Sequence, residues 1–231
     1  MLKYKKTNLK VIKMELKGKV INFLGDSITE GAVATCHENR FTNIVAAKTG
    51  AVCNNYGIGG TRIAEQFTPS SEPIFDRTFG SRVEEMEKNA DYVIVFGGTN
   101  DFGHGDAPLG TMYDRTTKTF YGALHLLYIS LIEKYPTAKI GVITPLHRCN
   151  EDNMRGDGDK AQDVATLKTY VEIIREVAEY YSLPVLDLFK SSGLQPKIPV
   201  IQEMYMPDGL HPNNAGHEIL ADKVIKFIET L

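Results

Sequence analysis

The stretch Phe23-Leu24-Gly25-Asp26-Ser27-Ile28-Thr29-Glu30-Gly31 carries the strongest indication of the fold. An apolar run, Val20 to Leu24, ends abruptly in Gly-Asp-Ser, and Gly25 and Gly31 bracket a turn that leads toward a helix. This pattern is typical of an α/β protein that presents a small polar side chain at the carboxyl end of a buried strand, where open sheets bind their ligands. Ser27 is therefore the first candidate for a functional residue, although a serine in a turn is more often a helix cap.

Segments of strand type and of helix type alternate along the rest of the chain. Strands are expected over 20–24, 51–54, 91–96, 138–144 and 184–188. Helices are expected over 39–48, 81–88, 120–135, 162–181 and 213–231. Polar, glycine-rich or proline-containing stretches over 66–77, 102–117 and 151–160 are expected to be loops; the first can form one wall of a substrate cleft, and the last is expected to be mobile surface.

This alternation predicts a parallel sheet that is covered by helices on both faces. Right-handed crossovers then favour a three-layer α/β/α, doubly wound sandwich with five strands. With 231 residues, of which 42% are hydrophobic and 24% charged, the chain is long enough for one well-buried domain and short for two. We expect residues 1–18 to be a solvated, disordered extension and residues 19–231 to be the single domain.

The charge of the chain excludes several classes of partner. A net charge of -3 and a pI near 6.1 give no reason to expect nucleic acid or an anionic membrane surface as a partner. No apolar core follows the lysines of the first twenty residues, so this region is neither a secretory signal nor a membrane span. The sequence therefore predicts a cytoplasmic protein without membrane insertion, whose translation starts at Met1 or at Met14. It does not predict the oligomeric state.

The cysteines do not form a recognisable framework. Cys36, Cys53 and Cys149 are odd in number and lack Cys-x-x-Cys spacing, which argues against disulfides and a structural zinc. Cys36 and His37 lie near Ser27 in sequence, but adjacent side chains seldom point at the same atom. We therefore expect reduced thiols, no metal and no cofactor.

Two distant segments strengthen the case for Ser27. The apolar run Tyr92 to Phe96 again stops in glycines followed by polar residues, Thr99-Asn100-Asp101, and the segment Pro207-Asp208-Gly209-Leu210-His211-Pro212 offers a histidine beside a carboxylate. Serine, histidine and aspartate are the components of an activated nucleophile. Because parallel strands end at one edge of a sheet, the segments around Ser27, Gly60 and Asn100 can converge.

Four sequence blocks, in this order, resemble the GDSL esterase and lipase family in its SGNH hydrolase form. They are Gly25-Asp26-Ser27-Ile28, with isoleucine in place of the family's leucine, then Asn55-Tyr56-Gly57-Ile58-Gly59-Gly60-Thr61, Gly98-Thr99-Asn100-Asp101 and Asp208-Gly209-Leu210-His211. The resemblance covers nearly the whole chain, and four ordered blocks are more specific than any one of them. It implies the strand order 2-1-3-4-5.

The resemblance also implies roles for individual residues. The predicted catalytic residues are Ser27 as nucleophile, His211 as the base that accepts its proton, and Asp208 as the carboxylate that orients His211. Asp187 and Asp101 are structurally plausible substitutes for Asp208. Alternatively, Asp208 and His211 merely cap the last helix.

Ester hydrolysis places negative charge on the former carbonyl oxygen, which fixed donors stabilise. The oxyanion hole that the resemblance implies consists of the backbone N–H of Ser27, the backbone N–H of Gly60 and the side-chain amide of Asn100. Gly57 and Gly59 are expected to serve turn geometry alone.

Other histidines and basic residues are weaker candidates. His147 and Arg148 follow the fourth strand, where they either contact substrate or are surface turn residues. His104 is a weak candidate for a functional residue, and His125 is expected to be packed within an apolar helix.

The leading functional prediction is a metal-independent serine esterase that acts through an acyl-enzyme on a small-molecule ester, with short acyl groups, such as acetyl, on a carbohydrate or another small molecule. Lysophospholipase or thioesterase activity is the alternative within the same family. A nucleotide binder is disfavoured because neither Gly-x-x-x-x-Gly-Lys-[Ser/Thr] nor Gly-x-Gly-x-x-Gly occurs. A non-catalytic carbohydrate binder would not need all the block residues together.

Overall fold

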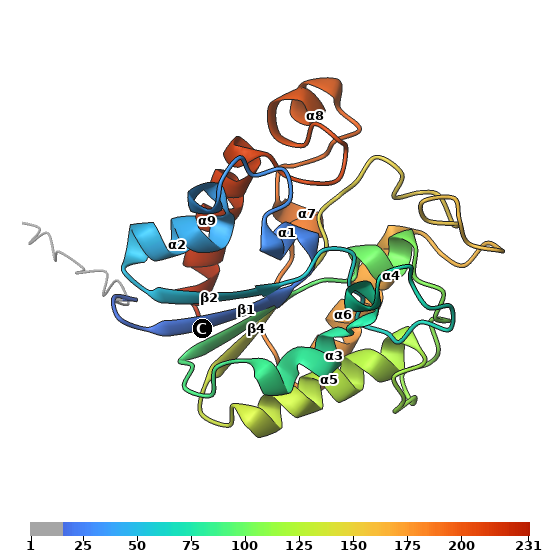
Figure 1. Ribbon diagram of the computed structural model, residues 1–231, viewed down its shortest axis with the longest axis horizontal. Helices are drawn as coiled ribbons and strands as arrows, with labels where there is room; N and C mark the ends of the chain where they lie inside the picture. The colour runs from blue at the N-terminus through green and yellow to red at the C-terminus, as the bar shows by residue number, and fades with distance from the viewer. Residues whose placement is uncertain (1–15) are drawn as a thin grey trace, which may run out of the picture.

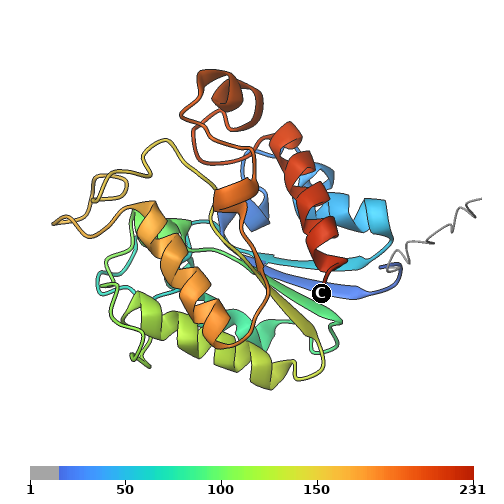
Figure 2. The ribbon, with the colours of Figure 1, turned by 180° about the vertical axis from the view of Figure 1, so that it is seen from behind.

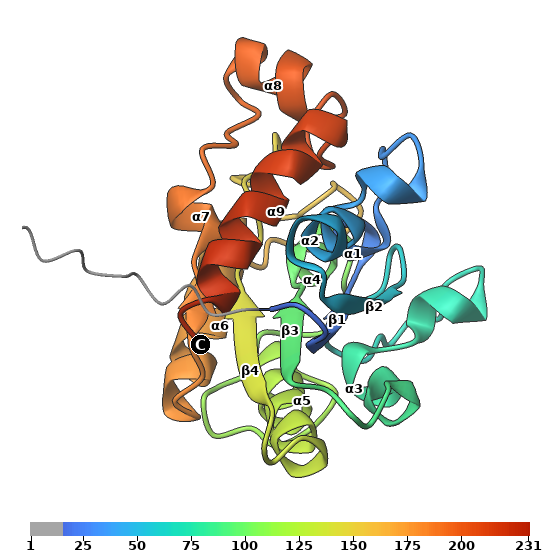
Figure 3. The same ribbon diagram turned by 90° about the vertical axis from the view of Figure 1, so that its left-hand side faces the viewer.

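The computed structural model describes residues 16–231, which form a five-stranded, all-parallel sheet in the order β2-β1-β3-β4-β5 (Figure 3). The strands are β1 (Val20–Gly25), β2 (Val52–Gly57), β3 (Tyr92–Phe96), β4 (Lys139–Ile143) and β5 (Val185–Leu186). The predicted fold class and strand order are therefore confirmed.

Helices cover both faces of the sheet (Figures 1 and 2). The longer helices are α2 (Phe41–Thr49), α5 (Phe120–Lys134), α6 (Leu167–Tyr180), α8 (Pro199–Tyr205) and α9 (Asn214–Ile228). Short helices are α1 (Ser27–Glu30), α3 (Phe79–Arg82), α4 (Thr99–Gly103) and α7 (Leu188–Ser191). Single 3-10 turns are η1 (His37–Asn39), η2 (Pro73–Asp76) and η3 (Val83–Glu85).

The two hydrophobic layers follow from the alternation of side chains along each strand. In β1, Phe23 packs with Phe41 of α2 and Val224 of α9, whereas the next residue, Leu24, packs in the layer that contains α5 and α6. β3 alternates in the same way. Figure 1 shows α2 and α9 on one face and α3 and α5 on the other. Central strands that are buried on both faces explain their nearly continuous apolar sequence.

Several elements differ from their predicted bounds for local reasons. The strand expected over 184–188 has only two residues, because the Asp187 carboxylate accepts a hydrogen bond from Lys190 N and caps α7. The helix expected from residue 162 begins at Leu167, since Val164 N and Leu167 N bond to carbonyls of the preceding loop. The helix expected over 81–88 begins two residues earlier as α3, capped by Thr78, and continues as η3. Helices α4, α7 and α8 have no counterpart among the helices expected from the sequence.

The folded part of the chain includes its first described residues. Leu16 is buried in the layer that contains α2 and α9, and Gly18 N donates a hydrogen bond of 2.8 Å to Gly50 O. Residues 16–18, which were assigned to the extension, thus pack against the domain. The rest of that extension, Met14 included, lies outside the described residues. Within residues 16–231, no helix has the length and apolarity that a membrane crossing requires.

Candidate active site

The strand register brings three sequence blocks to one edge of the sheet. Gly25, the last residue of β1, pairs with Gly57 at the end of β2 and with Phe96 at the end of β3. The residues that follow these ends therefore meet in space. The loop after β4 contacts the fourth block, because Cys149 N donates a hydrogen bond of 2.9 Å to Gly209 O.

Ser27 is the first residue of α1, directly after the turn that closes β1. Asp26 is the N-cap, with extended backbone and a side chain that accepts from Ile28 N at 3.0 Å. A Cβ added at Gly25 would lie 2.0 Å from Thr29 Oγ1, so only glycine permits this sharp turn. Gly31, with φ of 97°, ends the helix after one turn. The result is a fixed serine whose side chain still reaches solvent, at 8% exposure.

His211 lies within hydrogen-bond distance of Ser27, with 2.9 Å between Nε2 and Oγ. Its other ring nitrogen, Nδ1, lies 2.7 Å from Asp208 Oδ2. A carboxylate only accepts hydrogen bonds, so Nδ1 carries the proton and Nε2 of the neutral ring can accept from the serine hydroxyl. The structure thus brings all three predicted catalytic residues together in the order Ser27, His211, Asp208.

A tight turn holds the Asp208 carboxylate in place. Its Oδ1 accepts from Leu210 N at 2.9 Å and from His211 N at 2.7 Å. Gly209 supplies the left-handed backbone of this turn, with φ of 77°. Burial opposes ionisation of Asp208, but the hydrogen bonds from the backbone and ring of His211 keep its pKa below the usual value. Asp208 is therefore an ionised partner for the ring.

The two alternative carboxylates have other partners. Asp101 is buried and accepts from Ile63 N and Ala64 N at 2.9–3.1 Å. Asp187 forms an ion pair with Arg175 at 2.7 Å besides capping α7. Both carboxylates serve to fix the backbone.

The three predicted oxyanion donors lie on adjoining segments. Among the hydrogen bonds of the described residues, the backbone N–H groups of Ser27 and Gly60 have no acceptor. Asn100 is 5% exposed, and its Nδ2 donates to Thr61 O at 3.0 Å, which leaves its second amide hydrogen for another acceptor. Gly60 has φ of 72°. The site therefore retains donors that a developing negative charge could use.

One glycine of the second block has a closer relation to Ser27 than turn geometry requires. A Cβ added at Gly59 would lie 3.7 Å from Ser27 Cβ and 2.8 Å from Glu30 Oε2. The loop over 66–77 also approaches this block, since a Cβ at Gly60 would lie 3.4 Å from Phe75 Cδ1. Gly59 therefore lies in van der Waals range of Ser27 and against the Glu30 carboxylate, a proximity that the sequence pattern did not reveal.

A buried arginine ties these segments together. Arg82 of α3 donates to Tyr56 O at 2.6 Å, to Gly25 O at 3.1 Å and to Thr61 Oγ1 at 3.0 Å. Burial lowers the pKa of Arg82 to about 10, so it stays charged at neutral pH. It holds the ends of β1 and β2 and the start of the following loop in register.

The segment over 148–165 is attached to α4 rather than loose. Arg148, which is 5% exposed, donates to Thr99 O at 3.2 Å and forms an ion pair with Asp157. The Lys160 ammonium donates to Asp101 O at 2.9 Å and to Tyr170 Oη at 3.1 Å. We call residues 148–165 the strap. Most of residues 151–160 are exposed, as the sequence predicts, but the buried cations Arg148 and Lys160 anchor the strap at its start and near its end.

The three other histidines weighed as candidates have structural partners. His147 Nδ1 lies 2.7 Å from Glu151 Oε2, and its ring packs in a tilted arrangement against Phe189. His104 Nδ1 lies 2.8 Å from Arg62 Nη1, and the buried His125 lies 2.9 Å from Tyr181 Oη. Among residues 16–231, no cluster of metal-ligating side chains occurs, and Cys36, Cys53 and Cys149 are free thiols.

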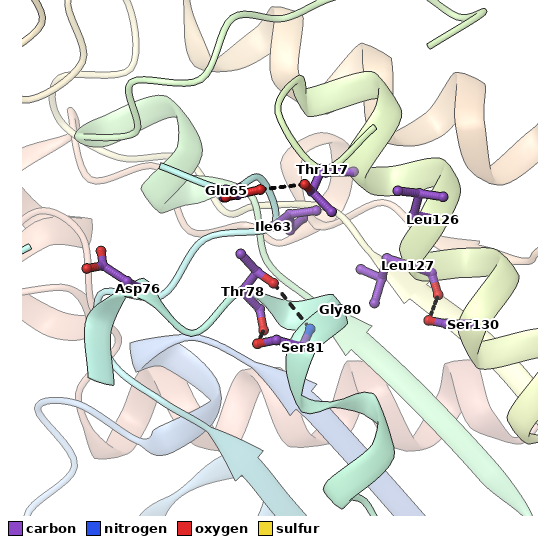
Figure 4. A pocket seen from close by; sticks show the side chains of 11 residues that line it. Ile63, Glu65, Asp76, Thr78, Gly80, Ser81, Thr117, Leu126, Leu127 and Ser130 are labelled. Atoms are coloured by element: carbon purple, nitrogen blue, oxygen red, sulfur yellow. Dashed lines mark hydrogen bonds between the residues drawn. The ribbon is translucent and has the colours of Figure 1, made fainter. Parts of the chain in front are cut away.

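A separate pocket of about 500 Å³ opens between α3 and α5 (Figure 4). Ile63 and Leu127 contribute apolar surface, and Thr117 Oγ1 donates to Glu65 Oε2 at 2.5 Å. None of Ser27, Asp208 and His211 lines it. The chemically equipped site is therefore the sheet edge rather than this pocket.

Comparisons with known proteins agree with this arrangement. The model of the GDSL-like Lipase/Acylhydrolase family matches residues 23–219. A protein from Lactobacillus plantarum of solved structure is 31% identical, with 93% of this chain and 98% of that chain covered and a TM-score of 0.79. A member of the lipolytic protein G-D-S-L family from Veillonella parvula is 16% identical over 92% of this chain and 99% of that chain, with a TM-score of 0.60. A search of curated proteins gives no match.

A third solved structure shares the fold in one part of a larger protein. It is a two-domain esterase active on acetylated mannans, 21% identical over 93% of this chain and 49% of that chain, with a TM-score of 0.63.

Proposed function

Since the chain belongs to the GDSL-like Lipase/Acylhydrolase family and is thereby a carboxylic ester hydrolase, we propose that it is a serine esterase that removes short acyl groups, such as acetyl, from a carbohydrate or another small molecule. The observation that carries the proposal is the continuous hydrogen-bond chain from Ser27 Oγ through His211 to Asp208. A free serine hydroxyl is a weak nucleophile, and an adjacent oriented base is what activates it.

In the proposed reaction, Ser27 Oγ attacks the ester carbonyl carbon while His211 Nε2 takes the hydroxyl proton. The tetrahedral intermediate collapses as the C–O bond to the alcohol breaks, and the proton on Nε2 passes to the departing alkoxide. The acyl group then remains on Ser27. Water then attacks the acyl carbon while Nε2 takes its proton. As this second tetrahedral intermediate collapses, the acyl–serine bond breaks, the carboxylic acid leaves, and Nε2 returns the proton to Ser27 Oγ.

The negative oxygen of each tetrahedral intermediate would be met by the N–H groups of Ser27 and Gly60 and the free amide hydrogen of Asn100. Their availability supports this role, because donors already held in place cost little reorganisation when charge develops. Removing one such donor costs roughly 3 kcal/mol of barrier stabilisation in comparable hydrolases.

The acetylated-carbohydrate assignment draws support from the esterase active on acetylated mannans, whose fold this chain shares. One observation favours the alternative, a lysophospholipase or thioesterase. Helix α8, which precedes Asp208, exposes about half of each of the side chains of Val200 and Met204, at 56% and 51%. Apolar side chains that face solvent beside a catalytic loop could contact a longer acyl chain.

Hydrolysis of p-nitrophenyl esters from acetyl to decanoyl tests both assignments, with wild type and Ser27→Ala compared in the presence of a chelator. The proposal expects turnover of the acetyl and butyryl esters by the wild type and a fall in kcat of about 10³-fold or more in the variant. Activity that rises with acyl length would favour the lipid or thioester alternative. An equally active Ser27→Ala would overturn the triad.

A further inference from the structure

Glu30 lies on the same short helix as the proposed nucleophile and reaches the glycine block. Ser27 and Glu30 are three residues apart in α1, which places them on neighbouring positions of one helix face. The Glu30 carboxylate, through Oε2, accepts a hydrogen bond of 2.9 Å from Gly59 N. This contact crosses from α1, the helix that begins in the first sequence block, to the loop after β2, which holds the second block.

The other hydrogen bonds that fix the glycine loop are made by the residues on either side of Gly59 and Gly60. Gly57 is anchored by Asn55 Oδ1, at 2.8 Å from its N, and Ile58 N donates to Gly25 O at 3.2 Å. On the other side, Thr61 Oγ1 donates to Ile58 O at 2.7 Å, and Thr61 accepts hydrogen bonds from Arg82 and Asn100. Between them, Gly59 and Gly60 have no side chains, and glycine samples a wide range of backbone angles. The bond from Gly59 N to Glu30 fixes the peptide just before the Gly59–Gly60 peptide, and among the hydrogen bonds of the described residues it is the one made by the backbone N–H of either glycine.

The close approach of the loop to α1 supports the same conclusion. A Cβ added at Gly57 would lie 2.1 Å from Glu30 N, and one at Gly59 would lie 2.8 Å from Glu30 Oε2. The backbone of the loop is thus seated directly on the last turn of α1. A shorter side chain at position 30 would remove the hydrogen bond from Gly59 N and leave the side chains of Ser27 and His211 unchanged.

We propose that Glu30 is a positioning residue that holds the Gly59–Gly60 peptide so that the Gly60 N–H faces the oxyanion. Glu30 does not touch the substrate in this role, and it acts through Gly59. The inference rests on the proposed esterase function, because the Gly60 N–H is proposed to donate to the oxyanion that forms during ester hydrolysis.

The charge of Glu30 is not what this role requires. A carboxylate close to the oxyanion repels it, although exposure to water weakens that repulsion strongly. The acceptor oxygen is what holds Gly59. Glutamine at this position retains an acceptor oxygen and removes the charge, so the conservative variant separates the two effects.

The test compares wild type, Glu30→Ala and Glu30→Gln with Glu179→Ala, a control that removes an exposed glutamate from α6. With p-nitrophenyl acetate, Glu30→Ala should lose about tenfold in kcat with KM changed by less than about twofold, since a misdirected oxyanion donor affects the transition state. A boronic acid, which forms a tetrahedral adduct on the serine, should bind about tenfold more weakly to Glu30→Ala. Glu30→Gln and Glu179→Ala should stay within about twofold of wild type.

Three results would overturn the inference: Glu30→Ala with unchanged kcat, a loss that lies in KM alone, or Glu30→Gln as impaired as Glu30→Ala. Amide hydrogen exchange of Gly59 and Gly60, measured by NMR, gives a readout that does not depend on turnover. Faster exchange in Glu30→Ala but not in Glu30→Gln supports the restraint, and equal exchange in all variants refutes it. A wild type without turnover of any ester would instead overturn the proposed function.

Discussion

Ser27 Oγ lies 2.9 Å from His211 Nε2, although 184 residues separate the two in the chain. The parallel sheet accounts for the meeting: Ser27 follows the end of β1, and His211 lies in a loop that is bonded to the segment after β4. This contact depends on two separate turns, one closed by Gly25 and the other by Gly209.

Replacing Asp208 by asparagine should reduce kcat by about 10³- to 10⁴-fold while the fold survives. Asparagine can still accept from Leu210 N and His211 N through one oxygen, so the turn is kept. Its amide would disfavour the tautomer with the proton on Nδ1 that leaves Nε2 free to accept. Steady-state kinetics with p-nitrophenyl acetate would measure the loss. Asp187→Asn is the matched control, and a larger loss there than in Asp208→Asn would reassign the carboxylate of the triad.

Replacing Asn100 by alanine should lower kcat by about 10²-fold with little change in KM, because the amide would act on the oxyanion and not on the ground-state ester. The same amide donates to Thr61 O, so a thermal unfolding curve must accompany the kinetics. Asn100→Asp keeps the size of the side chain and removes the donor. If Asn100→Asp retains the activity of the wild type, Asn100 is a turn residue without a part in catalysis.

The sequence was sufficient to predict those parts of the site that lie in short blocks directly after the strands. The alternation of strand segments with helix segments predicted the parallel sheet. The register of that sheet places the residues after Gly25, Gly57 and Phe96 at one edge. The contact of Gly59 with Glu30 could not be read in the same way. It depends on the path of a glycine loop, and glycine allows too many backbone angles for a pattern to select one.

The anchoring of the strap could not be predicted from the sequence, for a related physical reason. Its charged and glycine-rich sequence is typical of mobile surface, and that pattern carries no sign that Lys160 is 9% exposed or that Arg148 is 5% exposed. Their partners, Asp101 O and Asp157, are fixed by tertiary structure. Buried cations satisfied by distant acceptors are invisible to hydrophobic periodicity.

Replacing Lys160 by methionine should therefore destabilise the domain and reduce activity together. Methionine has a similar length, but Asp101 O would lose a buried donor, which costs about 1–3 kcal/mol. Because α4 also carries Asn100, we expect kcat to fall by several-fold, with about tenfold as the upper end. Urea unfolding and p-nitrophenyl acetate kinetics would measure the two effects. Lys168→Met, at an exposed site on α6, is the control, and equal stability of both variants would mean that the strap is not anchored by Lys160.

The last prediction concerns the pH dependence of stability that arises beside the nucleophile. Burial raises the pKa of Asp26 from its ordinary value of 3.8 to about 6, against the opposing hydrogen bond from Ile28 N and the charges of His211 and Arg82. A carboxyl whose pKa is higher in the folded state binds more protons folded than unfolded between these two values. Its contribution to stability is fully present below about pH 4 and is lost as the pH rises through about 6.

Asp26→Asn removes this titration and keeps the cap, since asparagine also accepts from Ile28 N. The free energy of unfolding of the variant, relative to wild type, should rise by roughly 3 kcal/mol between about pH 4 and pH 8, from 1.36 kcal/mol per unit of pKa. Loss of the counter-charge to Arg82 shifts this difference at the upper end of the range, so the rise between the two pH values is the quantity to compare. Urea unfolding across that range would measure it.

Asp159→Asn, at an exposed position, is the control, and its free energy of unfolding relative to wild type should not change with pH. A flat difference for Asp26→Asn as well would mean that Asp26 titrates alike in the folded and unfolded chains, and hence that the turn before Ser27 is open to water.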